Sequence, residues 1–366
     1  MQRARLVLTA AALATLFAVR PADATPGHTL FIASGIPSEP QVTIDLETLE
    51  QGQLAVKLNR AESLACGPDG LLYAGLSGYA GSGVRQIVRF DQDGHGFTTV
   101  IDFAETPALE KSGGPEGLSF GPGGELYFNT RANSAELPHT GVWRLPAQGG
   151  LPVRVMLPFT IQNAEATAFL IAGPYEGHLI AADYANARIV RIAPPFDVPQ
   201  TALDFIADVE DVNGLAVNSK GEIYAAKELV GIITKFAPDG APLGEVASTE
   251  YCIRKLTMDA SDNLYATTVE GPVLRVTPDG ALTVVGDVPE GNGLDVCEVA
   301  CAGCADGHGG ASSGASEEAL PDDGGCACRL DRGGTIQRGR AAALSALAMA
   351  CVFVRRRPRR SADHMR

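Results

Sequence analysis

Apolar and polar positions repeat in one pattern along most of this chain. The clearest copy begins at Asn213, where a short apolar run is followed by a turn at residues 219–221 and a second apolar run containing Tyr224. Two short runs joined by a tight turn predict a β-hairpin of half-buried strands. Four other copies begin at Glu62, Glu116, Glu165 and Arg254.

The repeats predict a β-propeller. One equivalent position of the second strand recurs at steps of about 40 to 55 residues, which is the length of a four-stranded blade. This position is held by Tyr73, Tyr127, Ile180, Tyr224 and Tyr265. A third apolar run follows each hairpin, and a fourth, outer run closes each unit, as at residues 188–192 and 281–286. The abundant glycine and proline, 42 and 23 residues, also suit many short strands joined by turns.

The two ends of the repeat region supply a sixth blade. Residues 292–296 copy a first strand without a second strand after them, and residues 29–35 match a second strand with Phe31 in the aromatic place. We therefore expect an all-β, six-bladed propeller. Its sixth blade is closed by N-terminal strands, from Thr29 to Leu58, that pair with the C-terminal strand from Asn292 to Val296. Such pairing closes the ring without leaving sheet edges exposed.

The N-terminal segment, residues 1–24, predicts export. It begins with Arg3 and Arg5, continues with an apolar run at 6–19 and ends in a small-x-small triplet at Ala24 that signal peptidase would cleave. The propeller is then expected over residues 25–300. A flexible stalk rich in glycine, serine and acids is expected over residues 301–325.

The C-terminal segment, residues 326–360, indicates a sorting signal, and residues 361–366 end the chain. Cys326 and Cys328 precede an apolar helix at 341–354 and an arginine cluster at 355–360. The apolar run is shorter than the roughly 20 residues of a permanent transmembrane helix, which favours a transient retention signal. This order resembles the MYXO-CTERM sorting tail of myxobacteria. The resemblance implies contact with the membrane through the tail, a membrane-embedded sorting protease, cleavage near Cys326 or Cys328, and display on the outer cell surface.

The formal net charge of −14 bears on the partners. The C-terminal residues are rich in arginine, so the middle of the chain is more acidic than the total suggests. Such a surface repels nucleic acid and favours cationic partners, or it serves only to keep an extracellular protein soluble. We expect a monomer that meets the export machinery and a small-molecule or protein ligand.

The residues that begin the first strands predict where a ligand binds. In a propeller the innermost strands start at the central channel, so these residues form a ring there. In the four hairpins without an insertion, the same distance separates this residue from the aromatic. The ring consists of Glu62, Glu116, Glu165, Asn213, Arg254 and Asn292. An acidic mouth of this kind would take a cationic or sugar-like ligand or a protein loop; alternatively, these residues only cap strands, with Arg254 paired among the glutamates.

The hairpins resemble two propeller families. Residues 182–192 and the Gly-Leu-Ala-Val hairpin at 213–217 resemble NHL repeats. Residues 116–128 and 213–216 resemble the regucalcin/gluconolactonase-like (SMP-30) propellers, and both resemblances span residues 28–297. The second implies an alternative function, an extracellular metal-dependent lactonase or esterase with oxygen ligands at the blade starts.

Oxygen ligands suit Ca²⁺ or another divalent cation, which would polarise a lactone or ester carbonyl. The candidate metal ligands are Glu62, Glu165, Asn213 and Asn292. Arg254 stands where the family pattern has Asp, and a guanidinium there would repel a cation. Catalytic residues stay unassigned, because the sequence contains neither a serine nucleophile elbow nor a phosphate loop.

The cysteines favour disulfides that pin the closing strand. Cys66 lies within a predicted strand and is expected to be a small buried apolar residue. The candidates for disulfides in an exported protein are Cys252, Cys297, Cys301 and Cys304.

Overall fold

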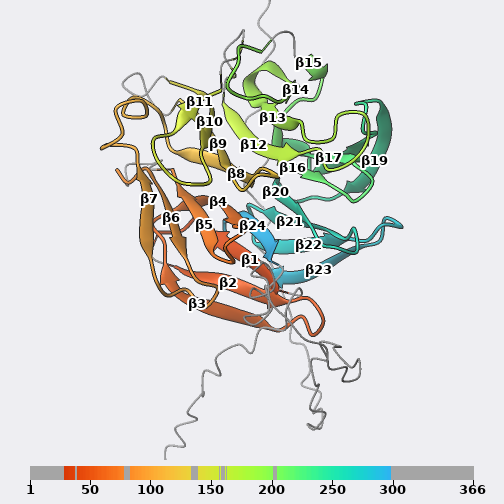
Figure 1. Cartoon of the computed structure of the whole chain (residues 1–366). Helices are drawn as coiled ribbons and strands as arrows, with labels where there is room; N and C mark the ends of the chain where they lie inside the picture. The colour runs from red at the N-terminus through yellow and green to blue at the C-terminus, as the bar shows by residue number, and fades with distance from the viewer. Residues whose placement is uncertain are drawn as a thin grey trace, which may run out of the picture. The chain divides into compact units, whose positions relative to one another are not determined.

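The structure is a computed structural model that describes residues 29–297 except residues 38, 78–82, 133–138, 156, 158–160, 162 and 201–203. Within these residues, 24 strands form six four-stranded antiparallel sheets arranged in a ring (Figure 1). The prediction of an all-β, six-bladed propeller is confirmed. No helix in the described part of the chain is long and apolar enough to cross a membrane.

Each sheet is one blade, and the strands of blades 1 to 5 follow the chain from the channel outward. Blade 1 has β4 (Ala61–Cys66), β5 (Leu72–Leu76), β6 (Gln86–Phe90) and β7 (Thr98–Asp102). Blade 2 has β8 (Pro115–Phe120), β9 (Leu126–Thr130), β10 (Gly141–Leu145) and β11 (Val153–Arg154). Blade 3 has β12 (Ala164–Phe169), β13 (Leu179–Asp183), β14 (Arg188–Ile192) and β15 (Asp204–Ile206).

Blades 4 and 5 repeat the order. Blade 4 has β16 (Val212–Val217), β17 (Ile223–Lys227), β18 (Ile232–Phe236) and β19 (Pro242–Ser248). Blade 5 has β20 (Ile253–Met258), β21 (Leu264–Thr268), β22 (Pro272–Val276) and β23 (Leu282–Asp287). Two short 3₁₀ helices, η2 (Tyr184–Asn186) and η3 (Glu228–Val230), join the second and third strands of blades 3 and 4.

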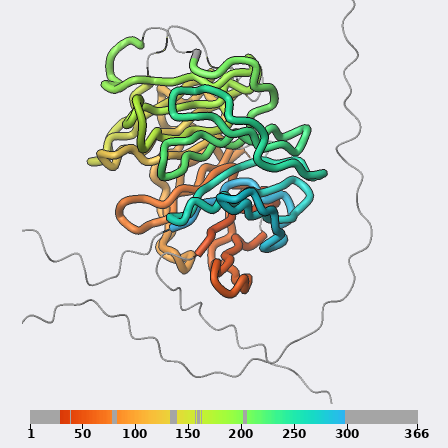
Figure 2. The backbone as a smooth tube through the Cα atoms, turned by 90° about the vertical axis from the view of Figure 1, so that its right-hand side faces the viewer, coloured from red at the N-terminus to blue at the C-terminus, as the bar shows by residue number. Residues whose placement is uncertain are grey.

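Blade 6 is built from both ends of the propeller, as predicted. Its order is β24 (Gly291–Cys297), β1 (Thr29–Ser34), β2 (Pro40–Asp45) and β3 (Gln51–Lys57). Strand β24 pairs antiparallel with β1, with Thr29 opposite Cys297 and Ile32 opposite Leu294. Figures 1 and 2 both show the red N-terminal strands beside the blue C-terminal strand. Strand β1 therefore has a partner on each edge, β24 on the inner side and β2 on the outer side.

The core lies between the blades. Six clusters of buried apolar side chains occur among the described residues, and each joins two neighbouring blades. The second strands β5, β9, β13 and β21 are buried along their whole length, because blades cover both of their faces. The outer strands are largely exposed, as in β19 and β23. The ring thus divides the described core into six layers.

Tight hairpin turns allow neighbouring blades to approach each other at one end of the ring. Gly221, in the turn between β16 and β17, has φ +76°. A Cβ at this position would lie 2.4 Å from the carbonyl oxygen of Ala172 in the turn of blade 3. Both the left-handed conformation and the lack of space therefore require glycine here.

Candidate functional site: a charged mouth of the central channel

A β-bulge turns each ring residue toward the channel. In every blade the pairing of the inner strand with the second strand skips at the ring position; for example, Ala61 pairs with Leu76 and Ser63 with Gly75, which leaves Glu62 out of the ladder. The other five inner strands show the same irregularity. A bulge bends the strand and re-aims the extra side chain. The ring is thus a structural register common to all six blades.

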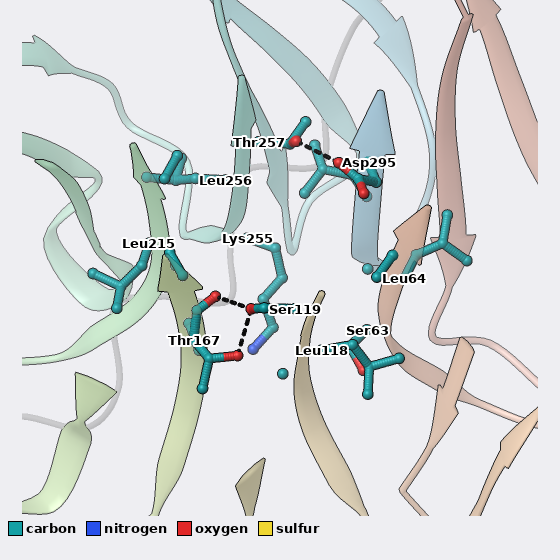
Figure 3. A pocket seen from close by; sticks show the side chains of 18 of the residues that line it. Ser63, Leu64, Leu118, Ser119, Thr167, Leu215, Lys255, Leu256, Thr257 and Asp295 are labelled. Atoms are coloured by element: carbon teal, nitrogen blue, oxygen red, sulfur yellow. Dashed lines mark hydrogen bonds between the residues drawn. The ribbon is translucent and has the colours of Figure 1, made fainter. Parts of the chain in front are cut away.

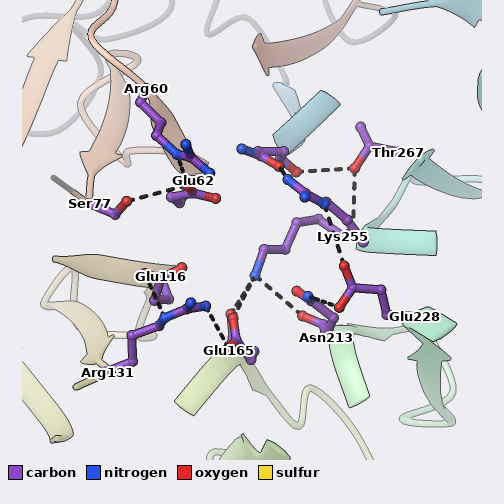
Figure 4. Close-up of polar contacts among 12 residues, drawn as sticks. Arg60, Glu62, Ser77, Glu116, Arg131, Glu165, Asn213, Glu228, Lys255 and Thr267 are labelled. Carbon is purple, nitrogen blue, oxygen red and sulfur yellow. Dashed lines mark hydrogen bonds and ion pairs between the residues drawn. The ribbon is translucent and has the colours of Figure 1, made fainter. Parts of the chain in front are cut away.

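The ring residues line a single cavity of about 250 Å³, which we call the charged mouth. All six predicted positions contribute to it: Glu62, Glu116, Glu165, Asn213, Arg254 and Asn292. Six further residues complete the lining: Arg60, Arg131, Asn163, Tyr184, Glu228 and Lys255. Figure 4 shows the polar contacts among most of these side chains. The sequence pattern identified the ring, whereas the second group lies outside the repeated position.

Ion pairs join the carboxylates of blades 1 to 3 to two arginines. Arg60 Nε donates to Glu62 Oε1 at 2.8 Å. Arg131 lies between two ring residues, with Nη1 3.0 Å from Glu165 Oε1 and Nε 3.6 Å from Glu116 Oε1. Glu62 also accepts a hydrogen bond from the Ser77 hydroxyl at 3.3 Å. Each ring glutamate therefore has a guanidinium beside it.

A second chain of contacts runs through blades 4 to 6. Asn213 Nδ2 donates to Glu228 Oε2 at 2.9 Å, and Arg254 Nε lies 3.5 Å from Glu228 Oε1. Arg254 Nη1 also donates to Asn292 Oδ1. The alternative in which Arg254 pairs among the ring glutamates is therefore not what the structure shows. Its carboxylate partner is Glu228, which the sequence analysis missed because it lies in η3, outside the repeated position.

Lys255 crosses the channel beneath the ring. Its ammonium donates to the carbonyl oxygen of Glu165 at 2.7 Å and to that of Asn213 at 3.4 Å, and it lies 3.9 Å from Glu165 Oε2 (Figure 4). A signal for it existed in the sequence. The position after the ring residue is small in the other five blades: Ser63, Gly117, Ala166, Gly214 and Gly293. In blade 5 this position holds a long charged residue, Lys255, whose side chain extends into the channel.

The mouth is not acidic, contrary to the prediction. Four carboxylates and four cations line it. The side chains of Arg60 and Arg131 are 18% and 25% exposed, whereas those of Glu62, Glu116 and Glu165 are 10%, 2% and 6% exposed. The Arg254 side chain is 20% exposed. Packing therefore places the arginines toward solvent and the ring glutamates beneath them.

Burial changes the acidity of two ring glutamates. Burial and the nearby carboxylates of Glu62 and Glu165 raise the pKa of Glu116 well above its usual range, although Arg131 and Lys255 act in the opposite direction. Burial also raises the pKa of Glu165, against the lowering influence of Lys255 and Arg131. The protonated, uncharged form of both groups is favoured by removal from water.

The residues of the mouth do not fit a divalent cation. No group of three or more His, Cys, Asp or Glu suited to a metal occurs among the described residues. The candidate ligands Glu62 and Glu165 are paired with Arg60 and Arg131, and the Lys255 ammonium lies below. A metal would have to displace these cations and would meet the Arg254 guanidinium as well. We therefore derive no chemistry through a metal at this site.

A second cavity, of about 300 Å³, lies further along the same inner strands (Figure 3). Its throat carries leucine two positions after the ring residue in five of the six blades: Leu64, Leu118, Leu215, Leu256 and Leu294. Thr167 holds this position in blade 3, and the Ser119 hydroxyl lies 2.7 Å from its hydroxyl. Glu116, Glu165 and Lys255 line both cavities, so they lie at the boundary between the charged mouth and this second cavity, whose lining also includes Thr257 and Asp295.

A disulfide joins blade 1 to the closing strand. Cys66 at the end of β4 is bonded to Cys297 at the end of β24, at a sequence separation of 231. The interpretation of Cys66 as an unpaired apolar residue was therefore wrong, because ring closure brings β24 alongside β4. Cys252 is also disulfide-bonded. The candidates Cys301 and Cys304 lie outside the described residues, as do Ala24, Cys326 and Cys328.

Comparison with known proteins supports the architecture. No family model and no curated protein sequence matches the chain. Among solved structures, a chain of a nidogen/laminin complex superposes with a TM-score of 0.53 at 15% identity, over 73% of this chain and 97% of that one. This chain shares its fold. At this identity, the likeness of the propeller to solved structures concerns the fold alone.

Two other similar structures are enzymes by their descriptions. A protein described as a gluconolactonase has a TM-score of 0.49 at 19% identity, over 67% of this propeller chain and 87% of its own. Virginiamycin B lyase from Staphylococcus aureus has a TM-score of 0.47 at 14% identity, over 71% of this chain and 80% of its own. Neither likeness bears on the activity of this propeller.

Proposed function

We propose that this protein is an exported, cell-surface-anchored propeller that binds a small polar ligand in the charged mouth. The observation that carries the proposal is the set of polar atoms buried in this cavity without a hydrogen-bond partner among the described residues. They are Glu116 Oε1, Asn213 Oδ1 and Asn292 Nδ2. Buried polar atoms are normally satisfied, and a ligand or ordered water would satisfy these.

The size of the mouth favours a small molecule over a protein loop. A cavity of about 250 Å³ lies just below the range of about 300–1,000 Å³ typical of sites for drug-sized ligands. Its lining is charged on all sides and held by ion pairs, so the site is formed before a ligand arrives. Preformed polar groups reduce the ordering cost of binding. The lactonase alternative depends on a bound metal ion, and the arginine and lysine side chains that line the mouth would repel one.

Binding is tested with a panel of small sugars, amino acids, organic acids and amines. Thermal unfolding and calorimetry of the full chain should detect at least one ligand, and Asn213→Leu should abolish that signal. The matched control is Asn186→Leu. Asn186 lies in η2, hydrogen-bonds to Asp183 and is not part of the cavity lining, so this variant should leave binding intact. A ligand that binds the Asn213→Leu protein as tightly as the native protein would place the site elsewhere.

Export and anchoring rest on the terminal patterns, and the Cys66–Cys297 disulfide supports an oxidising compartment. We expect the full chain to lose its first 24 residues and to be accessible to protease added to intact cells. Cys326→Ser and Cys328→Ser variants, made one at a time, should show which cysteine the sorting protease requires. An uncleaved chain that stays inside the cell would contradict this part of the proposal.

A further inference from the structure

We propose that the second cavity is a separate binding site for a small organic amine, whose ammonium group pairs with Asp295 and whose apolar body fills the channel. The site lies further along the inner strands than the charged mouth and does not depend on the function proposed for the mouth. The sequence analysis expected a cationic ligand at the ring glutamates, whereas the structure points to a different carboxylate.

Asp295 is the only charged residue at its position in the six inner strands, all of which the structure describes. This position lies three residues after the ring residue. The other five blades have an uncharged residue there, and all six residues line the second cavity: Ala65, Ser119, Ala168, Ala216, Thr257 and Asp295. A carboxylate removed from water is unfavourable unless it is paired, so its presence at this level calls for a partner.

The two neighbouring blades hold the Asp295 carboxylate in place. The backbone N–H of Cys66 in blade 1 donates to Oδ2 at 2.9 Å, and the Thr257 hydroxyl in blade 5 donates to Oδ1 at 2.8 Å (Figure 3). The backbone N–H of Val296 also donates to Oδ1, at 2.9 Å. A carboxylate has about four acceptor sites, so one site on Oδ2 stays open to a ligand. Asp295 is partly exposed, which leaves that site accessible from the cavity.

No described residue forms an ion pair with Asp295. The other ionisable groups that line this cavity already have partners, since Glu116 and Glu165 lie beside Arg131. The Lys255 ammonium is held by the carbonyl oxygen of Glu165 at 2.7 Å, at the boundary with the charged mouth. Burial raises the pKa of Asp295, although its three hydrogen bonds act in the opposite direction. An ammonium group beside this carboxylate would favour its ionised form.

The rest of the cavity suits the apolar body of the ligand. Its volume of about 300 Å³ is at the lower end of the range of about 300–1,000 Å³ typical of small-molecule sites, which are mostly apolar with a few polar groups. Beyond the leucines of the throat, Phe120 in blade 2 and Phe169 in blade 3 line it. Blade 3 lies opposite blade 6 in a ring of six. A ligand that spans the channel therefore has Asp295 at one end and aromatic rings at the other.

Compounds that differ in one group test the site by calorimetry on the full chain. The amines are 2-phenylethylamine and hexylamine, and the stronger of the two identifies the apolar body. The corresponding alcohols, 2-phenylethanol and 1-hexanol, should bind at least about tenfold more weakly, because they cannot form a charge-assisted hydrogen bond. Methylamine, which lacks the body, and 3-phenylpropanoate, which has the opposite charge, should not bind. Raising the salt concentration should weaken binding of the amines.

Variants assign the effect to the second cavity. Asp295→Asn should weaken binding of the better amine at least about tenfold. Met258→Trp fills the cavity without changing Asp295 and should also block binding, so it tests the site if Asp295→Asn fails to fold. The matched control Asp262→Asn removes the same charge from the turn between β20 and β21, outside the lining, and should leave the affinity unchanged. Asn213→Leu should also leave it unchanged, because Asn213 lines the charged mouth and not this cavity.

Three results would overturn the inference. One is the absence of binding by both amines up to about 10 mM. Another is binding of the alcohols as tight as that of the amines, since the carboxylate would then contribute nothing. The third is binding of an amine that survives Asp295→Asn and Met258→Trp or is abolished by Asn213→Leu, since the amine would then lie elsewhere. None of these results counts against the function proposed for the charged mouth, which the earlier panel tests separately.

Discussion

Arg131 bridges Glu116 and Glu165, two buried carboxylates from neighbouring blades. Its Nη1 lies 3.0 Å from Glu165 Oε1 and its Nε 3.6 Å from Glu116 Oε1. One guanidinium thereby links blade 2 to blade 3 at the rim of the channel. The contribution of this side chain to stability can be measured by substitution.

Arg131→Met should destabilise the fold by about 2–3 kcal/mol at pH 7, because two buried carboxylates lose the guanidinium between them and keep only Lys255 as a nearby cation. The loss should shrink at pH 4, where the carboxylates are more readily protonated. Urea unfolding at both pH values measures the effect. In the matched control Arg89→Met, the exposed pair with Asp69 is lost, and the cost should stay below about 1 kcal/mol. An equal loss in both variants would refute the bridging role.

Glu116→Gln should make stability less dependent on pH. The raised pKa of Glu116 means that the folded protein holds this proton to higher pH than the unfolded chain does. Stability from this group is therefore lost as pH rises from the ordinary carboxyl pKa of 4.5 toward the raised folded value. The variant should gain stability relative to the native protein between pH 4 and pH 8, as followed by urea midpoints.

Glu222→Gln is the control of opposite sign. Burial raises the pKa of Glu222, but hydrogen bonds with Lys235 and Asn218 outweigh it and lower the pKa overall. Its contribution to stability is therefore present above the ordinary pKa and lost as pH falls through the folded value. Glu222→Gln should cost more at pH 7 than at pH 3. The Glu116 prediction is wrong if both variants change with pH in the same direction.

Lys255→Met should destabilise the propeller by about 2–4 kcal/mol, since two carbonyl oxygens and a buried carboxylate lose the ammonium between the two cavities. Methionine keeps most of the length of the side chain, so the change isolates the charge. Lys220→Met, in an exposed hairpin turn, should change the free energy of unfolding by less than about 0.5 kcal/mol. A neutral effect of Lys255→Met would show that the ammonium contributes no net stability.

Removing the Cys66–Cys297 disulfide should cost about 4–5 kcal/mol, because it restrains a loop of 231 residues in the unfolded chain. The double variant Cys66→Ala, Cys297→Ala is compared with the native protein by urea unfolding, and the native protein is measured again under reducing conditions. The reducing conditions should lower the midpoint at least as much as the double substitution, because they also break the disulfide of Cys252. A double variant as stable as the oxidised native protein would show that strand pairing alone closes the ring.

Added Ca²⁺, Zn²⁺ or Mn²⁺ should shift the midpoint of thermal unfolding by less than about 1 °C, since the side chains of Arg60, Arg131, Arg254 and Lys255 already lie beside the ring carboxylates. EDTA should likewise have no effect, and sugar lactones should not be hydrolysed faster with metal present. A clear stabilisation by one metal that is lost in Glu62→Gln and Glu165→Gln would restore the lactonase alternative.

The architecture was readable from the sequence because each blade is specified locally. Apolar alternation and turn residues define four strands at nearly constant spacing, and the isolated copies at Asn292 and Phe31 reveal the closing blade. The constant offset between ring residue and aromatic also placed Glu62, Glu116, Glu165, Asn213, Arg254 and Asn292 at one level of the channel. The repeated pattern predicts these positions because every blade has the same four strands and packs against its neighbours in the same way.

Tertiary structure alone decided the chemistry of the mouth. Arg60, Arg131 and Glu228 lie outside the repeated position, next to β4, next to β9 and in η3, and the arrangement of the blades brings them to the ring. Cys66 meets Cys297 only because the ring closes. The sequence determined which charges are present in the propeller. It did not determine which of them face solvent, since exposure depends on side chains that meet across blades far apart in the chain. For that reason an acidic sequence forms a mouth whose most accessible ring-level charges are arginines.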